Sequence, residues 1–144
     1  MFCVIITVSA CKPNRAANIR HQVIAAHDLL MAEEDQAVTL KMQLDSLALK
    51  TINAKQPGLD TTSEQREVKE FQSMLTKASD DMSDWMHRFD PELKGKSDDE
   101  SVQYYQNQAE KIKSLDKEYQ KAINQTSAFL KGLHVEPVKP KAGN

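Results

Sequence analysis

Apolar residues recur in steps of three and four along three long segments of the chain, and the connectors between them carry proline, glycine or clustered charges. This spacing is typical of helices that bury one stripe against neighbouring helices. The first series reads Ile19, Val23, Ala26, Leu30, Glu33, Ala37, Leu40, Leu44, Leu47 and Thr51. It predicts a helix over residues 15–55, which Gln56-Pro57-Gly58 ends.

More apolar residues lie beside this series and widen the stripe: Leu29, Met31, Val38, Met42, Leu49 and Ile52. We expect a helix with so wide a stripe to be buried on more than one side, against a third helix or another protomer. Glu33 is the one acidic member of the series. Its carboxylate is expected to extend to the solvent, to pair with a cation across the bundle, or to fix the register of the helices.

A second series predicts a helix over residues 63–90, with Thr62 and Gln65 as a capping box at its start. Its members are Val68, Phe71, Leu75, Ala78, Met82, Trp85 and Phe89. The helix should end before Pro91, because the residue that precedes a proline is disfavoured in the α conformation.

The third segment predicts a helix over residues 98–132, opened by the capping box of Ser97 and Glu100. Its stripe reads Val102, Tyr105, Ala109, Ile112, Leu115, Tyr119, Ile123, Thr126, Leu130 and Leu133, with Leu115 taking the place of Asp116. Short connectors favour antiparallel neighbours. The fold class is therefore all-α, an antiparallel up-down-up three-helix bundle of long coiled-coil-like helices over residues 18–134, with a flexible tail over residues 135–144.

The charge distribution argues against one class of function, nucleic-acid binding. The 144 residues carry 19 basic and 21 acidic side chains, a formal net charge of -2. These charges are interspersed, whereas a nucleic-acid-binding protein needs a basic face or stripe. Nucleic acid is therefore not an expected partner.

The apolar run over residues 2–10 ends at Cys11. Nine residues are too short to cross a hydrocarbon core of ~30 Å, but they suit the apolar region of a secretory signal. Val8-Ser9-Ala10-Cys11 has the order of a lipobox, an aliphatic residue and two small residues before a cysteine. The sequence predicts a lipoprotein signal peptide over residues 1–10, acyl chains such as palmitate on Cys11, and a lipidated N-terminus and linker over residues 11–17.

Two alternatives to the lipoprotein prediction stay open. Signal peptides usually begin with Lys or Arg, and Met1-Phe2-Cys3 contains neither, so the true start of translation could lie upstream. The other alternative is an apolar segment of a cytosolic coiled-coil adaptor, buried in the core and ending in a cysteine by coincidence.

Asp80, Asp84 and His87 share one face of the second predicted helix. An Asp-x-x-His pair resembles half of a carboxylate-bridged di-metal site, which makes these three residues the metal-ligand candidates. The other histidines have no acidic residue three positions before them. We therefore expect a solvated polar face here, with neither a metal nor a cofactor.

Aromatic residues cluster near the end of the second helix and the start of the third. Trp85 and Phe89 lie on the stripe and are expected to seal one end of the bundle, with a recognition surface as the alternative. Tyr105 should point inward and Tyr104 outward.

Patterns typical of catalysis are missing. Residues 12–144 contain no cysteine, no Gly-x-Ser-x-Gly turn, no glycine-rich phosphate loop and no His-Glu-x-x-His pair. The expectation is therefore a protein without catalytic activity.

The lipobox, the heptad helices and Asp84-Trp85-Met86-His87 together resemble a family of small Bacteroidetes lipoproteins, often labelled viral A-type inclusion proteins because of their coiled-coil similarity. The resemblance implies a place in the cell envelope and no known activity. The residue after Cys11 is Lys12, whereas an aspartate at this position retains lipoproteins in the inner membrane. The acidic run that marks export to the cell surface in Bacteroidetes is also missing after Cys11. An outer-membrane lipoprotein that faces the periplasm is the implied location.

The leading hypothesis is a lipid-anchored helical protein with a structural or protein-binding role, through a protein partner or self-association. A ligand- or metal-binding bundle that uses Asp84 and His87 is the alternative. A periplasmic chaperone-like protein that binds unfolded clients is a further one.

Overall fold

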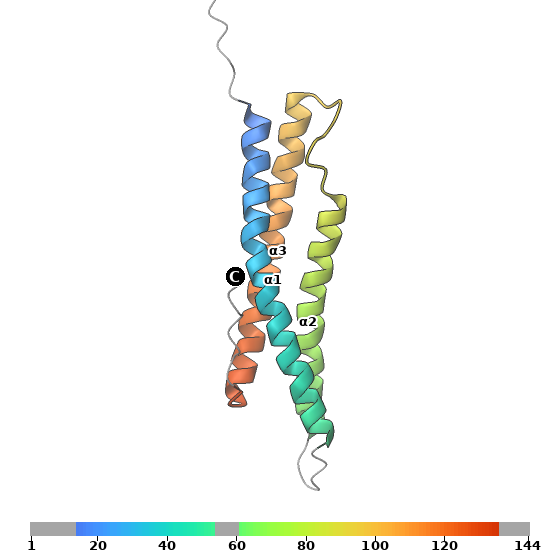
Figure 1. Ribbon diagram of the computed structural model, residues 1–144, viewed down its shortest axis with the longest axis vertical. Coiled ribbons are helices and arrows are strands. Elements are labelled where there is room, and N and C mark those ends of the chain that lie inside the picture. The colour runs from blue at the N-terminus through green and yellow to red at the C-terminus, as the bar shows by residue number, and fades with distance from the viewer. Residues whose placement is uncertain (1–13, 54–60, 136–144) are drawn as a thin grey trace, which may run out of the picture.

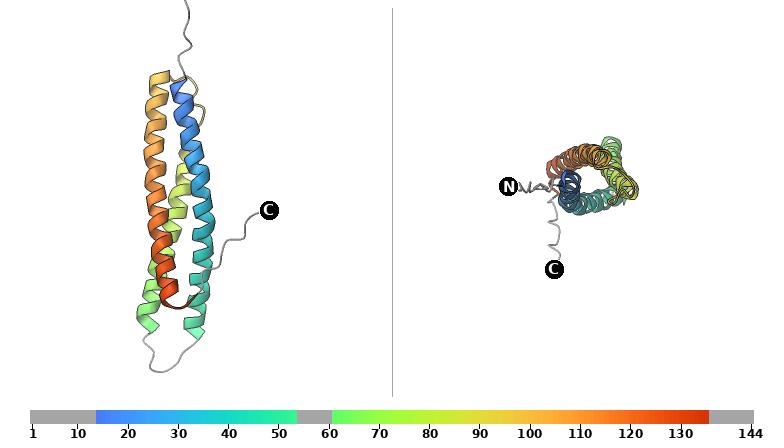
Figure 2. Two further views of the ribbon diagram at one scale, coloured as in Figure 1. Left: turned by 90° about the vertical axis from the view of Figure 1, so that its left-hand side faces the viewer. Right: turned by 90° about the horizontal axis from the view of Figure 1, so that it is seen from above.

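The computed structural model describes residues 14–53 and 61–135 as three long helices (Figure 1). They are α1 (Arg15–Asn53), α2 (Thr61–Arg88) and α3 (Asp98–Gly132). The chain runs up, down and up again, and the end-on view in Figure 2 shows the helices grouped around one shared axis. The predicted all-α, up-down-up three-helix bundle is confirmed. The predicted signal peptide, Cys11 and residues 136–144 lie outside the described residues.

The observed bounds of α3 are the predicted ones, and hydrogen bonds at its start show why the helix begins there. The Ser97 Oγ accepts from the Glu100 backbone N–H at 3.3 Å, and the Glu100 carboxylate accepts from the Ser97 backbone N–H at 2.9 Å. This is the predicted capping box, and the helix begins at the next residue, Asp98. The hydrogen bonds from Ser97 lower the pKa of the Glu100 carboxyl, since they favour its charged form.

The boundaries of α2 differ from the prediction. The helix already begins at Thr61, so Thr62 lies inside it and is not the N-cap. It ends at Arg88, two residues before the predicted end, and the Asp90 N–H has left the helical pattern. The Phe89 N–H still reaches the Trp85 carbonyl at 3.0 Å, but the Asp90 N–H donates to the Tyr104 hydroxyl at 2.7 Å.

The predicted stripes form the core. In α1 the buried residues are Ala16, Val23, Leu30, Ala37, Leu40 and Leu44. In α2 they are Val68, Leu75, Ala78, Met82 and Trp85. In α3 they are Val102, Tyr105, Gln108, Ile112, Leu115, Tyr119, Ala122, Ile123, Thr126 and Leu130. As predicted, Leu115 is buried and Asp116 is exposed.

Within one chain, most of the residues that widen the stripe of α1 are not buried. Met31 is half-buried, but Leu29, Val38, Met42 and Leu49 are exposed, as is Ile24. Ile52 lies where side chains are not described. The reason is geometric, since α2 and α3 can cover only one side of α1 in a three-helix bundle.

Two leucines of α1 provide a matched test of this arrangement. Leu44 is fully buried, whereas Leu49 is 62% exposed. Leu44→Ala should lower the free energy of unfolding by about 2–5 kcal/mol, through lost burial and a residual cavity. Leu49→Ala should change it by less than about 0.5 kcal/mol. Urea unfolding at low protein concentration measures both, and equal effects of the two substitutions would contradict the orientation of α1.

Candidate functional site

The most unusual surface of the molecule lies on α1, on the side turned away from α2 and α3. Among the described residues, the three most exposed large apolar side chains are Leu29 at 77%, Met42 at 65% and Leu49 at 62%. Small residues recur every seven positions along the same stretch: Ala25, Ala32, Thr39 and Ser46. Steps of seven return to nearly the same side of a helix, so these four residues form one line, with Leu29 roughly 80° to one side of it and Met42 and Leu49 roughly 60–80° to the other. We call this arc the outer face of α1.

The hydroxyl groups of the outer face are already bonded. Thr39 donates its hydroxyl to the Asp35 backbone carbonyl at 2.9 Å, and Ser46 donates its hydroxyl to the Met42 backbone carbonyl at 3.0 Å. A partner could therefore cover this face without leaving either hydroxyl unsatisfied. Three exposed charged residues, Asp28, Asp35 and Lys50, lie within this arc and separate Leu29 from Met42 and Leu49.

The opposite side of α1 carries a polar group that joins all three helices. Tyr119 of α3 is fully buried and donates its hydroxyl to the Glu34 carboxylate of α1. Ser79 of α2 donates to the same carboxylate, 3.0 Å from each oxygen. Burial raises the pKa of Tyr119, and its hydrogen bond to Glu34 raises it further, so the hydroxyl keeps its proton. We call Glu34, Ser79 and Tyr119 the polar layer.

Glu33, the carboxylate singled out by the sequence, has a different role. Its Oε1 accepts from the Gln120 side-chain amide of α3, so its partner across the bundle is an amide and not a cation. Its Oε2 is buried with no hydrogen-bond partner among the described residues. Burial raises the pKa of Glu33. The sequence reasoning missed Glu34 because it lies beside the apolar series; the signal that could have found it is Tyr119, a buried position whose hydroxyl needs an acceptor.

The aromatic residues seal one end of the bundle, as predicted. Trp85 is buried and donates its Nε1–H to the Gln108 side-chain oxygen at 2.9 Å. Its ring stacks on Phe89 at 4.8 Å between centroids and on His27 at 5.5 Å. These contacts engage the indole on both its apolar and its polar side, which favours a packing role over a recognition surface.

Two tyrosines fasten the connector between α2 and α3 to this end. Tyr105 points inward, as predicted, and donates to the Pro91 carbonyl at 2.9 Å. Tyr104 is half-buried rather than turned outward, because its hydroxyl accepts the Asp90 N–H. Arg20 of α1 also donates to the Pro91 carbonyl, at 3.2 Å.

The metal-ligand candidates lie on one exposed face of α2, and two of them have partners on their own helix. Asp84 forms an ion pair with Arg88 at 2.8 Å, and the His87 Nδ1 lies 2.7 Å from the Ser83 carbonyl of its own helix. Asp80 is exposed and lines a cleft toward α1. Among the described residues, no three histidine, cysteine, aspartate or glutamate side chains lie close enough to hold one metal ion.

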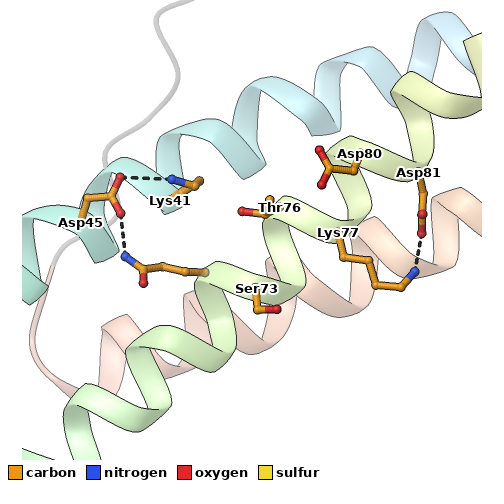
Figure 3. A pocket seen from close by; sticks show the side chains of 8 residues that line it. Lys41, Asp45, Ser73, Thr76, Lys77, Asp80 and Asp81 are labelled. Atoms are coloured by element: carbon orange, nitrogen blue, oxygen red, sulfur yellow. Dashed lines mark hydrogen bonds and ion pairs between the residues drawn. The ribbon is translucent and has the colours of Figure 1, made fainter. Parts of the chain in front are cut away.

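That cleft, of about 520 Å³, lies between α1 and α2 (Figure 3). Asp45 accepts from Lys41 at 3.4 Å and from Gln72 at 2.6 Å, and Lys77 is paired with Asp81. The hydrogen bond from Lys77 lowers the pKa of Asp81. Charged groups that already have partners are costly to redirect toward a ligand. The cleft is therefore a less persuasive binding site than the outer face of α1.

A second, more apolar groove of about 330 Å³ lies between α1 and α3. Its walls include Leu29, Leu30 and Ile112, with Glu33 and Lys113 beside them. Leu29 therefore belongs both to this groove and to the outer face, which extends the apolar surface of α1 toward α3.

Comparisons of the chain with protein-family models, with curated proteins and with solved structures found no match. Within residues 14–53 and 61–135, no helix combines the length and the apolarity needed to cross a membrane.

The polar layer can be tested by removing one hydroxyl. Tyr119→Phe should lower the free energy of unfolding by about 1–3 kcal/mol, because it removes a hydrogen bond to a charged acceptor in the interior. Tyr104→Phe is the matched control, since it removes a hydroxyl that accepts from an exposed N–H which water can replace. Urea unfolding compares the two variants, and a Tyr119→Phe variant at least as stable as the parent would exclude a structural role for the layer.

Proposed function

We propose that this chain is a lipid-anchored helical protein of the cell envelope that binds another protein and has no catalytic role. The observation that carries the proposal is the outer face of α1, with Leu29, Met42 and Leu49 exposed on an otherwise well-packed bundle. Several large apolar side chains exposed along the solvent side of one helix are a feature of interaction sites in soluble domains. Covering one such side chain fully is worth about 1.5–3 kcal/mol, so a partner would gain substantially by binding here.

The pattern at the N-terminus supports the anchor. Lys12 and Pro13 separate Cys11 from Asn14, whose side chain accepts the Ala17 N–H at 2.9 Å and caps α1. A chain spans at most about 3.6 Å per residue, so acyl chains on Cys11 would hold the start of α1 close to the membrane surface. The connector between α2 and α3 lies at the same end of the bundle (Figure 1). The proposed location is the periplasmic face of the outer membrane.

The anchor predicts the mass of the native protein. Protein purified from the membranes of its host should have the mass of residues 11–144 plus acyl chains, because the signal peptidase cuts before the lipidated cysteine. Intact mass spectrometry measures this. The mass of the full unmodified chain would contradict the anchor and would move the search for partners to the cytosol.

The binding role predicts where a partner can be cross-linked. A photo-reactive amino acid that replaces Met42 should capture a protein in cells, because this position lies in the outer face. The same substitution at Met86 is the matched control, since Met86 is 41% exposed but lies on α2. Photo-cross-linking followed by mass spectrometry identifies the captured chain. Equal capture at both positions, or capture at neither, would count against a binding role for the outer face.

A further inference from the structure

We infer that the groove between α1 and α3 receives an arginine side chain of the partner protein, whose guanidinium group pairs with Glu33 and Asp116. This inference names the chemistry of the partner in the proposed function, so it rests on the binding role given there, but it does not depend on the lipid anchor. Three observations carry it: two carboxylates that lack a cation, apolar walls beside them, and the position of the groove next to the outer face.

Two carboxylates face the groove from different helices without a cation between them. Glu33 of α1 and Asp116 of α3 both line it. Burial raises the pKa of the Glu33 carboxyl, the hydrogen bond from Gln120 lowers it, and the charge of Asp116 raises it again, so the two carboxylates repel each other. Within residues 14–53 and 61–135, neither carboxylate forms an ion pair. A positive group placed here would offset that repulsion.

One oxygen of Glu33 lacks a donor. Its Oε1 accepts from the Gln120 side-chain amide, whereas its Oε2 is buried and has no hydrogen-bond partner in the part of the chain that the structure describes. A carboxylate oxygen that has lost water without gaining a donor is unfavourable. The last torsion of a glutamate side chain is soft, so a small rotation turns this oxygen toward a donor that enters the groove.

Most of the groove is apolar, which selects among cations. Its walls include side chains of both helices, namely Val23, Ala26, Leu29, Leu30, Ala109 and Ile112. Arginine and lysine pack their apolar stems on such walls while the charged group reaches a carboxylate. A metal ion would make no use of the walls, and among the described residues no three histidine, cysteine, aspartate or glutamate side chains can hold one.

The two carboxylates favour arginine over lysine. A guanidinium group presents five N–H donors in one plane, so a single side chain can serve both Glu33 and Asp116. It is also more weakly hydrated than an ammonium group, which lowers the cost of entering an apolar groove. Lys113 lines the groove too, but its ammonium group pairs with neither carboxylate, so the chain does not neutralise the site itself.

The groove adjoins the surface that the proposed function assigns to a partner. Leu29, which is 77% exposed, belongs both to the outer face of α1 and to a wall of the groove. A protein that covers Leu29 therefore passes the mouth of the groove. Arginine is enriched at protein–protein interfaces, where its pairing with a carboxylate in a shielded pocket adds specificity.

A small analogue of the arginine side chain tests the site. The full chain with Cys11→Ser carries no acyl chain on that residue, and butylguanidinium supplies a guanidinium group on an apolar stem. It should shift the methyl NMR signals of Ala26 and Ala109 in a saturable way, with a dissociation constant of roughly 1–20 mM. Butylurea, of similar shape but uncharged, should bind at least about tenfold more weakly.

Matched substitutions locate the charges. Glu33→Gln and Asp116→Asn should each weaken the binding of butylguanidinium about three- to tenfold, because each removes one negative charge from the groove. Glu70→Gln is the control, since it removes the same charge from an exposed site of α2 and should change nothing. Lys113→Gln should strengthen binding, because it removes a competing positive charge. Urea unfolding of each variant establishes that it is folded.

Three results with butylguanidinium would overturn the inference: no saturable shift up to about 50 mM, equal binding of butylurea, or binding that neither Glu33→Gln nor Asp116→Asn weakens. These results concern the groove alone and leave the binding role of the outer face standing.

The photoprobe at Met42 extends the test to the partner. Capture at Met42 should fall several-fold when Glu33→Gln and Asp116→Asn are combined, because the partner then loses its ion pairs. Undiminished capture would keep the binding role and exclude an arginine in the groove. No capture at Met42 in the parent chain would instead end the binding role, and the inference with it.

Discussion

The bundle depends on one shared carboxylate. Glu34 accepts hydrogen bonds from Ser79 of α2 and from the buried Tyr119 of α3, so a single side chain of α1 fixes its rotation against both neighbours. An apolar stripe tolerates small slips along the helix axes, whereas a buried hydroxyl that loses its acceptor costs about 1–3 kcal/mol. The polar layer therefore selects one register from the several that a heptad pattern allows.

The same rotation determines which side of α1 faces away from the bundle. With Glu34 directed between α2 and α3, the residues on the opposite side of the helix include Ala25, Leu29 and Ala32. Interior packing and exposed surface are thus two consequences of one constraint. A variant that releases Glu34 would be expected to change both, because α1 would then be free to turn.

The second fixed point lies closer to the C-terminal end of α2, less than two helical turns beyond Ser79. Trp85 is held by Gln108 and by the rings of His27 and Phe89, and Tyr105 ties the connector to the same end. The two polar contacts are separated along the helices by apolar layers such as Leu30, Met82 and Ile112. Together they set both the rotation and the length of overlap of the helices, which the apolar stripes alone specify only approximately.

Much of this could be predicted from the sequence, because a seven-residue repeat reports directly which side of a helix is apolar. The stripes, the capping box at Ser97 and the inward position of Tyr105 follow from local rules. Two features could not be found this way. The role of Glu34 depends on the residue across from it, and the exposure of Leu49 depends on how many helices are available to cover α1. Likewise, the spacing of Asp84 and His87 places them on one face but does not provide ligands from a neighbouring helix. Lipidation of Cys11 stays a prediction.

The most direct test of this packing is methionine oxidation followed by mass spectrometry. Met82 is buried in the core, Met42 lies in the outer face, and Met86 is exposed on α2. The packing predicts that Met42 and Met86 oxidise readily and that Met82 oxidises slowly, because only Met82 is closed off from solvent. Oxidation of Met82 as fast as that of Met42 would contradict it.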